Sequence, residues 1–585
     1  MRLVQTKGTT GYPKQAAEYQ RRTAVPETYD VKTLIDVKAP MRDGVQLSAD
    51  IYLPKAPGPF PTVLVRTPYD NSADGHVQNG KRFASKGYAF VVQDLRGRFD
   101  SAGDYYPYLH EAEDGFDTDE WIGQQAWSNG KIGTSGGSDL GLTQWISAPL
   151  ASRYLTCMAP RVIGADQYSG LFYPNGAFQL FVIFGWAMRN CFRTRQPGLE
   201  PHEWRQAMRT LPLRDMDRVI GRDLPYWKDW IDHAAYDDYW EPLNIEQRLP
   251  EVAAPAFNMG GWYDINSRET FINFNALRLH GKTPEAQQSK LIVGPWPHSL
   301  SASTVNGDVD FGPDSKVDIA ALELRWFDYW LKGDANGIVD EPPLRLFIMG
   351  TNVWRDEHEW PLARTDWQRW YLHSRGHANT LLGDGELASD EPAAEPADTY
   401  VYHPEYPVPT FGGSPCCDNA VVPWAAQDQR DVEMRRDVLC YTSAPLKEDL
   451  EVTGPVQLIL YATTDGRDTD WTAKLVDVRP DRYAMILCNG IIRARCRESL
   501  SQPTLLEPGK VYRYEISVGV TGIVFQQGHR LRLEVSSSNF PLYDRNLNTG
   551  NRLGQDAELR VALQTILHSR EHPSHLVLPV IPAAC

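Results

Sequence analysis

Residues 133–141 read "GTSGGSDLG" and contain two serines that could act as a catalytic nucleophile. Ser135 completes a literal G-x-S-x-G pattern, whereas Ser138 stands in "GGSDLG", where the second glycine comes one position late. The G-x-S-x-G pattern is typical of the nucleophile elbow, a sharp turn between a strand and a helix. The stretch therefore indicates hydrolysis by an activated serine, but the pattern alone does not decide which serine reacts.

A serine hydroxyl is a weak nucleophile at neutral pH, so it needs a histidine base and an acid that orients the base. In α/β-hydrolases these residues follow the serine in the order Asp or Glu, then His, each just after a strand. Asp264 ends the apolar run "AFNMGGWYD", and His298 follows "LIVGPWPH". The segment "NSRETFINFNALRLHG" between them can form a crossover helix. We therefore expect Asp264 and His298 at the carboxyl edge of one parallel sheet, where such folds place their sites.

The local sequence favours Ser138 over Ser135. A nucleophile at Ser135 would follow a strand of only Lys131–Thr134, and its helix would open with two glycines, each costing about 1 kcal/mol. A nucleophile at Ser138 leaves a longer strand, with Gly136 and Gly137 supplying the tight backbone. Asp139 then opens the helix, where a negative charge meets the positive end of the helix dipole.

The elements around these residues predict an α/β core. Residues 61–70 and 88–97 are β-rich, residues 80–87 can form a short helix, and residues 111–125 form an acidic, then amphipathic, helix. Alternating strands and helices predict a parallel sheet with helices on both faces. The core is expected over residues 1–165 and 251–365, and the second part ends with an amphipathic helix at 318–333 closed by Gly333.

Two other segments differ from this core. Residues 166–250 are rich in aromatic residues and arginine and predict a mostly helical insertion, which we treat as a cap. Residues 366–585 carry little helix signal and several strands, at 455–464, 511–520 and 529–539. In the second of these strands Tyr512, Tyr514, Ile516 and Val518 alternate with polar residues, so one face is buried. The last segment therefore predicts a β-sandwich.

Long motifs then identify a resemblance. They include "APMRDGVQLSADIYLP" (39–54), "VRTPYD" (65–70), "EDGFDTDEWIGQQAWSNGKIGTSGGSDLG" (113–141), "GGWYD" (260–264), "GPWPHS" (294–299) and "GHRLRLEVSSSNFPLYDRNLNTG" (528–550). With these motifs the chain resembles the cocaine esterase/glutaryl acylase (CocE/NonD) group of α/β-hydrolases, which is related to the X-Pro dipeptidyl-peptidases. The resemblance runs through most of the chain and is weakest in the aromatic middle segment.

The resemblance implies an α/β-hydrolase core, a helical cap and a C-terminal jelly-roll β domain. It implies Ser138 as the nucleophile, His298 as the base and Asp264 as the orienting acid. The oxyanion would be held by the Tyr69 hydroxyl and the backbone N–H of Asp139, a type of group that stabilises developing negative charge. The expected reaction is ester hydrolysis through an acyl-enzyme, with no metal and no organic cofactor.

Asp139 departs from the family, which commonly has tyrosine after the nucleophile. The backbone donor survives any side chain. A carboxylate beside the oxyanion hole would oppose the developing charge, unless it points outward and caps the helix.

Two alternatives stay open. The enzyme could cleave amides, as a β-lactam side-chain acylase or a dipeptidyl-peptidase, which need a subsite for a substrate amine or carboxylate. Asp166, Asp237 and Asp238 could supply an amine subsite, or they could be solvated surface residues. Alternatively, the chain could be an inactive hydrolase fold that binds a partner.

Composition limits the partners. The net charge of −16 repels phosphate backbones, so we expect a small-molecule substrate and no nucleic acid. The first twenty residues lack the apolar region of a secretion signal, and the longest apolar run, "LFVIFGWAM", is far short of the roughly 20 residues that span a membrane. A cytoplasmic protein without a membrane partner is therefore expected, and a homodimer stays open.

The eight cysteines do not predict a disulfide framework. Cys416 and Cys417 are neighbours, which rarely bridge well, so all the cysteines are expected to be small core residues.

Overall fold

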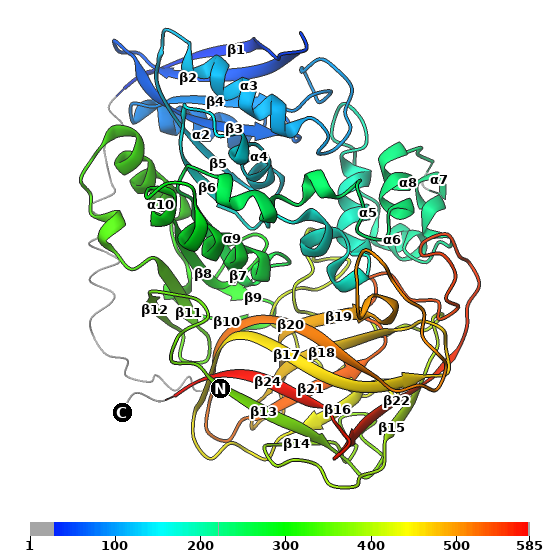
Figure 1. Cartoon of the computed structure of the whole chain (residues 1–585). Coiled ribbons are helices and arrows are strands. Elements are labelled where there is room, and N and C mark those ends of the chain that lie inside the picture. The colour runs from blue at the N-terminus through cyan, green and yellow to red at the C-terminus, as the bar shows by residue number, and fades with distance from the viewer. Residues whose placement is uncertain (1–28, 220, 583–585) are drawn as a thin grey trace.

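The computed structural model describes residues 29–219 and 221–582. A ten-stranded sheet lies within residues 31–357 and a twelve-stranded sheet within residues 366–581. Figure 1 shows the first sheet with its helices above the second sheet, and the cap helices α5–α8 beside both. The chain thus has the expected α/β-hydrolase core, helical cap and C-terminal β domain.

The core sheet is mixed, and its central strands are parallel. The strand order is β1-β2-β4-β3-β5-β6-β7-β8-β11-β12, and every pair from β4 to β11 is parallel. The carboxyl ends of these strands therefore meet at one edge, which is where α/β folds place their sites. The strands are β1 (Val31–Pro40), β2 (Gln46–Pro54), β3 (Phe60–Thr67), β4 (Ala89–Asp94), β5 (Ser128–Gly137), β6 (Leu155–Arg161), β7 (Phe257–Tyr263), β8 (Lys290–Pro297), β11 (Leu344–Ile348) and β12 (Val353–Glu357).

Helices cover both faces of the core sheet. On one face α2 contributes Phe83, and α10 contributes Trp326, to a cluster with the buried side chains of β3 and β4. On the opposite face Ile122 of α3 packs against Leu64 and Val91. The predicted doubly covered sheet is therefore present. The helices are α2 (Asp74–Ser85), α3 (Glu111–Gly123), α4 (Asp139–Ser147), α9 (Ser267–His280) and α10 (Ile319–Phe327).

The helix expected at 318–333 is not α-helical throughout. Its α part ends at Phe327, and a π-helical turn (Asp328–Lys332) follows before Gly333 adopts the left-handed conformation (φ 81°). Gly333 is thus the terminator that the sequence indicated, since glycine takes this conformation without a Cβ clash.

The cap lies between β6 and β7 and is built from short helices around an aromatic cluster. Trp204, Trp227, Trp230 and Trp240 are almost fully buried there. Large aromatic side chains compensate for the short elements, because each buries a large apolar area. The helices are α5 (Leu180–Arg189), α6 (Pro201–Ala207), α7 (Met216–Val219) and α8 (Pro225–Asp232).

The C-terminal β domain is a jelly-roll sandwich whose strand pairs are antiparallel, except that β14 pairs parallel to β16. Its longest pair is β17 with β20, and in β20 Tyr514, Ile516 and Val518 are buried while Arg513 and Glu515 are exposed, as the alternation predicted. The strands are β13 (Asp366–His373), β14 (Glu386–Ala388), β15 (Asp398–Tyr402), β16 (Leu439–Thr442), β17 (Leu450–Thr464), β18 (Asp470–Val478), β19 (Ala484–Arg493), β20 (Tyr512–Phe525), β21 (Arg530–Ser536), β22 (Ala562–Ser569), β23 (His572–Pro573) and β24 (His575–Ile581).

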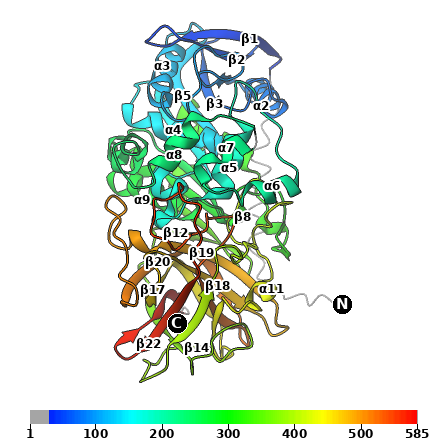
Figure 2. The same ribbon diagram turned by 90° about the vertical axis from the view of Figure 1, so that its right-hand side faces the viewer.

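The hydrolase core and the β domain share one continuous apolar core. Trp262 and Tyr263 at the end of β7 lie in the same cluster as the inner side chains of the sandwich. The Tyr263 hydroxyl donates to the carbonyl of Ile486 in β19 at 3.2 Å, and the Trp262 indole donates to Phe347 at 2.7 Å. Figure 2 shows β19 and β20 directly below the core and cap. The end of β7 is therefore held both by its own sheet, through Phe347 of β11, and by the β domain, through Ile486 of β19.

A buried ion cluster also joins the β domain to the cap. The Arg493 guanidinium donates to Asp470 at 2.9 Å and to Asp544 at 2.8 Å, and all three residues are nearly inaccessible. Asp544 in turn accepts a hydrogen bond from the backbone N–H of Phe178 in the cap.

We expect Arg493→Met to lower the free energy of unfolding by about 3–5 kcal/mol, because it leaves two buried carboxylates without their cation. Urea denaturation followed by circular dichroism measures this loss. Arg513→Met is the matched control, since the exposed Arg513–Glu515 pair contributes only about 0–1 kcal/mol. Equal losses in the two variants would contradict the prediction.

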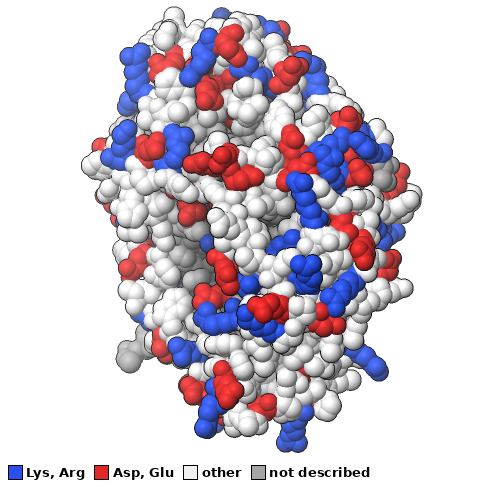
Figure 3. Space-filling model, turned by 45° about the vertical axis from the view of Figure 1, so that its right-hand side comes forward, with Lys and Arg blue, Asp and Glu red and all other residues white. Residues whose placement is uncertain are grey.

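The surface carries both signs of charge. Figure 3 shows Lys and Arg side chains lying among Asp and Glu side chains on one face of the molecule. In the part of the chain that the structure describes, no helix has the length and apolar character needed to cross a membrane.

Candidate active site

Ser138 lies at a strained turn between a strand and a helix. Strand β5 ends at Gly137, and helix α4 begins at Asp139, so Ser138 is the single residue between them. Its φ and ψ angles are 57° and −128°, a conformation that is unfavourable for a residue with a Cβ atom. Its backbone N–H donates to the carbonyl of Arg161 in β6 at 2.9 Å, which holds the turn. This is the geometry of a nucleophile elbow.

Two glycines allow this turn to be tight. A Cβ atom on Gly136 would lie 2.4 Å from Cβ of Leu140, and one on Gly141 would lie 2.6 Å from the Ile163 side chain. The close approach of strand and helix therefore requires glycine at both positions. The sequence argument named Gly136 and Gly137, but Gly137 is less restricted, with its nearest contact at 3.4 Å.

Ser135 is a buried residue within β5. Its hydroxyl donates to Oε1 of Glu323 in α10 at 2.9 Å, and Glu323 also pairs with Arg161. The literal G-x-S-x-G serine thus lies inside the sheet and bonds to a helix on its face, whereas Ser138 lies at the sheet edge.

Asp264 and His298 meet at the same edge. Asp264 directly follows β7, and His298 directly follows β8, which pairs parallel to β7. Nδ1 of His298 lies 2.6 Å from Oδ2 of Asp264. The Asp264 side chain is fully buried, and its other oxygen accepts the N–H of Asn266 at 2.9 Å. Because this pairing occupies Nδ1, the remaining nitrogen, Nε2, is left to act as a base.

Tyr69 lies beside the elbow, just after β3. Its hydroxyl accepts a hydrogen bond from the indole of Trp186 at 2.9 Å and donates to Oδ2 of Asp139 at 3.3 Å. Trp186 comes from α5 in the cap and stacks on Tyr108. The cap therefore positions the hydroxyl that the resemblance implies as an oxyanion donor.

The side chain of Asp139 turns inward, toward Tyr69. The residue is only 7% exposed, so the alternative of an outward-pointing cap is wrong. Burial, together with the nearby carboxylate of Glu111, raises the pKa of Asp139 to about 7, although hydrogen bonds from Tyr69 and Trp186 and the charge of Arg98 act to lower it. The residue thus changes charge near neutral pH, next to the expected oxyanion site.

We expect Asp139→Asn to raise kcat/KM. The ratio of the variant's kcat/KM to that of the unaltered enzyme should grow roughly 10-fold as the pH rises through about 7. Above that pH the unaltered carboxylate repels the oxyanion and holds the Tyr69 proton, whereas asparagine stays neutral. Taking the ratio of the two pH profiles removes the titration of the base. A ratio that does not vary with pH would contradict this role.

The same substitution should also change how the stability of the fold depends on pH. Because the folded pKa lies above the ordinary value, ionisation of Asp139 opposes folding. Relative to Asp139→Asn, the unaltered protein should therefore lose stability as the pH rises from about 4 to about 7.

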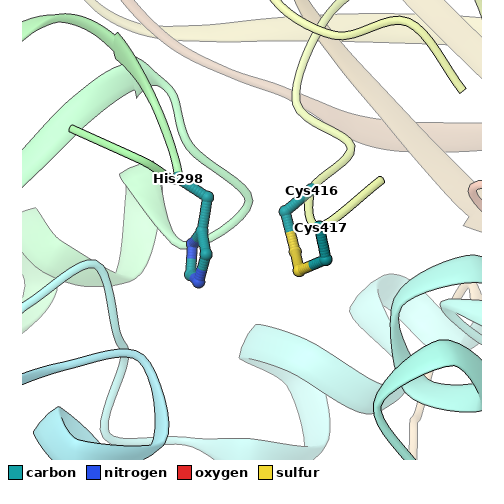
Figure 4. Close-up of side chains that lie close together, drawn as sticks. All are labelled: His298, Cys416 and Cys417. Carbon is teal, nitrogen blue, oxygen red and sulfur yellow. A yellow bond between two sulfur atoms is a disulfide. The ribbon is translucent and has the colours of Figure 1, made fainter. Parts of the chain in front are cut away.

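Cys416 and Cys417 form a disulfide, so the expectation that neighbouring cysteines stay unbridged is wrong. An extended backbone would point their side chains apart. Here Cys417 has a φ of 83°, and this turn brings both sulfurs to one side of the loop. Figure 4 shows the pair facing His298 across a short gap. Cys157, Cys440, Cys488 and Cys496 are buried and unbridged, as expected, while Cys191 is partly exposed.

The three acidic cap residues have different surroundings. Asp166 is buried and bonds to the N–H of Tyr168 and to Ser169. Asp237 is exposed and pairs with His233, and Asp238 is exposed. Asp237 and Asp238 are thus surface residues, and Asp166 stabilises the turn in which it lies by bonding to Tyr168 and Ser169.

Sequence reasoning missed Trp186 and the bridged cysteines. Trp186 stands in the apolar run "LFVIFGWAM", where nothing separates it from core residues. Adjacent cysteines in a loop containing "GGSPCC" were a visible signal, because glycines permit the turn that a vicinal bridge needs.

Both the hydrolase core and the C-terminal domain match known protein families. A family described as X-Pro dipeptidyl-peptidase (S15 family) matches residues 43–300, and one described as X-Pro dipeptidyl-peptidase C-terminal non-catalytic domain matches residues 336–577. The chain is 38% identical over 572 residues to the cocaine esterase of Rhodococcus sp. (strain MB1 Bresler), which covers 93% of this chain and 98% of that protein.

Two solved structures are also similar over their full length. An α-amino acid ester hydrolase is 28% identical with a TM-score of 0.81, covering 95% of this chain and 97% of that chain. An aminopeptidase from the marine sediment archaeon Thaumarchaeota archaeon is 26% identical with a TM-score of 0.81, covering 96% of this chain and 99% of that chain.

Proposed function

The chain belongs to the cocaine esterase (CocE/NonD) family of α/β-hydrolases, and we propose that it hydrolyses small carboxylic esters through an acyl-enzyme on Ser138. The observation that carries the proposal is the Asp264–His298 pair at 2.6 Å, at the same sheet edge as the strained Ser138 turn. Two of these residues lie at the ends of neighbouring parallel strands, and the third follows a strand of the same sheet.

In the proposed mechanism, Nε2 of His298 removes the Ser138 proton as Oγ attacks the ester carbonyl. The buried Asp264 carboxylate holds the imidazole tautomer and stabilises the imidazolium. Collapse of the tetrahedral intermediate releases the alcohol, which takes the proton from His298. Water then attacks the acyl-enzyme with His298 again as the base, and the carboxylic acid leaves.

Two donors would stabilise the oxyanion. The N–H of Asp139 is available because the first N–H groups of a helix have no acceptor within it. The Tyr69 hydroxyl is the second donor, supported by the indole of Trp186. Desolvation holds the pKa of Tyr69 well above its usual range, as does the neighbouring Asp139, so the phenol keeps its proton for donation.

Amide cleavage is the second candidate, supported by the match to the peptidase family and by the similarity to an aminopeptidase. His298 protonates the leaving group in both reactions, but an amine is a poorer leaving group than an alcohol, so amide cleavage depends more strongly on that proton transfer. The same residues would serve both reactions, so substrates decide between them.

The test combines active-site labelling with a substrate panel. A fluorophosphonate probe should label the protein once, at Ser138, and mass spectrometry of the tryptic peptides identifies the residue. The panel contains aryl esters, β-lactam amides and X-Pro anilides. We expect the aryl esters to give the highest kcat/KM of the panel. Absence of both labelling and turnover would favour the alternative of an inactive protein that binds a partner.

A further inference from the structure

The Cys416–Cys417 bridge and His298 lie together although they come from different domains. One ring nitrogen of His298 and the two sulfur atoms all lie within 4.8 Å of one another. His298 follows strand β8 of the core, whereas the cysteines belong to a loop between β15 and β16 of the β domain. Figure 4 shows the imidazole and the bridge side by side. Nothing in the proposed hydrolytic mechanism uses the sulfurs.

The loop that carries the bridge is held from both sides. Ser414 donates through its N–H to the side chain of Asn489 in β19 at 3.3 Å. Asp418 pairs with Arg189 of cap helix α5 at 3.1 Å. Cys416 is itself buried in an apolar cluster, while Cys417 is exposed. Opening the bridge would therefore leave both sulfurs beside His298, with one side reachable by small molecules.

The arrangement matches the ligand preferences of a zinc-class cation. Zinc binds thiolate sulfur at about 2.3 Å and imidazole nitrogen at about 2.0–2.1 Å, so two sulfur ligands lie about 3.8 Å apart in a tetrahedral site. The three donor atoms lie within 4.8 Å of one another, and the two sulfurs are bonded to each other. Once their bond is broken, the sulfurs must move apart and all three donor atoms must close around one centre.

Asp264 supplies an independent reason to expect a metal ligand at His298. Histidines that bind metals usually donate their other ring N–H to a carboxylate, which fixes the tautomer and raises ligand basicity. Nδ1 of His298 already lies 2.6 Å from the buried Asp264 carboxylate. Nε2 is thereby prepared to donate its lone pair, either to a proton or to a cation.

We propose that the reduced Cys416–Cys417 pair and Nε2 of His298 form a binding site for a thiophilic divalent cation of the zinc class, and that the bound cation blocks hydrolysis. The disulfide form lacks thiolates and does not bind it. The site is thus open to metal only after reduction. The proposal that the cation binds depends only on the geometry of the site. The proposal that it blocks hydrolysis depends on the proposed role of His298 as base.

The chemistry balances as follows. A phosphine reductant gives two electrons to the disulfide, the sulfur–sulfur bond breaks, and water supplies the oxygen of the phosphine oxide and the two thiol protons. The cation then displaces both thiol protons, binds two thiolates and Nε2, and takes water as its fourth ligand. The lone pair that would remove the serine proton is now used by the metal.

Binding is tested with Co²⁺ on the full-length protein, because cobalt replaces zinc in tetrahedral sites and gives a thiolate charge-transfer band in the near ultraviolet. The protein is reduced with a phosphine, desalted without oxygen and titrated. We expect the band to saturate at one cation per chain in the reduced protein and to be absent in the oxidised protein. The Cys416→Ala/Cys417→Ala variant is the matched control, since it keeps the other cysteines and should give no band.

Inhibition is measured separately, as aryl-ester hydrolysis with and without Zn²⁺. The reduced enzyme should lose at least about 10-fold in rate at saturating metal, and the oxidised enzyme and the double alanine variant should change less than about 2-fold. A band of equal size in the double variant, or none in the reduced protein, would overturn the site. A saturating band without inhibition would instead overturn the block and count against His298 as base.

Discussion

Replacing Ser138 by alanine should reduce kcat for an aryl ester by roughly 10⁴–10⁶-fold and abolish fluorophosphonate labelling. The loss is large because the hydroxyl is the only atom that forms the acyl bond in the proposed mechanism. The strained φ of 57° at Ser138 is imposed by the turn and not by the hydroxyl, so the fold should survive the change. Stopped-flow or burst kinetics on the purified variant measure the effect.

Ser135→Ala is the control for this experiment. It removes the hydrogen bond to Glu323, so it should lower the free energy of unfolding by about 1 kcal/mol. The site of labelling should stay at Ser138. If Ser138→Ala kept its activity while Ser135→Ala lost it, the literal motif would be right and the assignment wrong.

Asp264→Asn should lower kcat by about 10⁴-fold with little change in the fold. Asparagine has nearly the same shape, but its amide offers N–H groups to Nδ1 and so favours the tautomer that carries a proton on Nε2. That nitrogen is then unable to accept the serine proton. Because the effect is on the chemical step, kcat should fall much more than KM changes.

Asp238→Asn is the matched control, since it removes an exposed carboxylate from the cap. Its kcat for a neutral ester should be unchanged. A comparable loss in both variants would show that charge in general, and not the Asp264–His298 pair, determines the rate. A selective loss of activity toward substrates with a free amine in Asp238→Asn would revive the amine-subsite alternative.

The sequence was sufficient to predict where β7 and β8 end, and therefore that Asp264 and His298 lie close together. Strands β7 and β8 are short apolar runs with clear polar ends, and parallel pairing brings such ends together. The preference for Ser138 over Ser135 came from strand length and helix opening, and β5 does run to Gly137. These are local properties, which neighbouring residues determine.

The sequence did not predict the contacts between segments that lie far apart in the chain. Whether Asp139 pointed inward depended on Tyr69 and on Trp186, which is contributed by the cap. The placement of the cysteine loop against His298 depended on how the β domain packs on the core. Neither periodicity nor spacing carries such information, because both describe one element at a time.

The shared apolar core has a consequence for how this enzyme can be divided. The two residues that precede the acid, Trp262 and Tyr263, pack among sandwich side chains, and Tyr263 donates to β19. A chain ending before β13 would remove the sandwich side chains that pack against both aromatics and the acceptor of the Tyr263 hydroxyl, so the backbone that precedes Asp264 would be less firmly held. The C-terminal domain thus helps to hold the proposed acid in place, and we expect the minimal active unit to extend well beyond the segment that carries the proposed reacting groups.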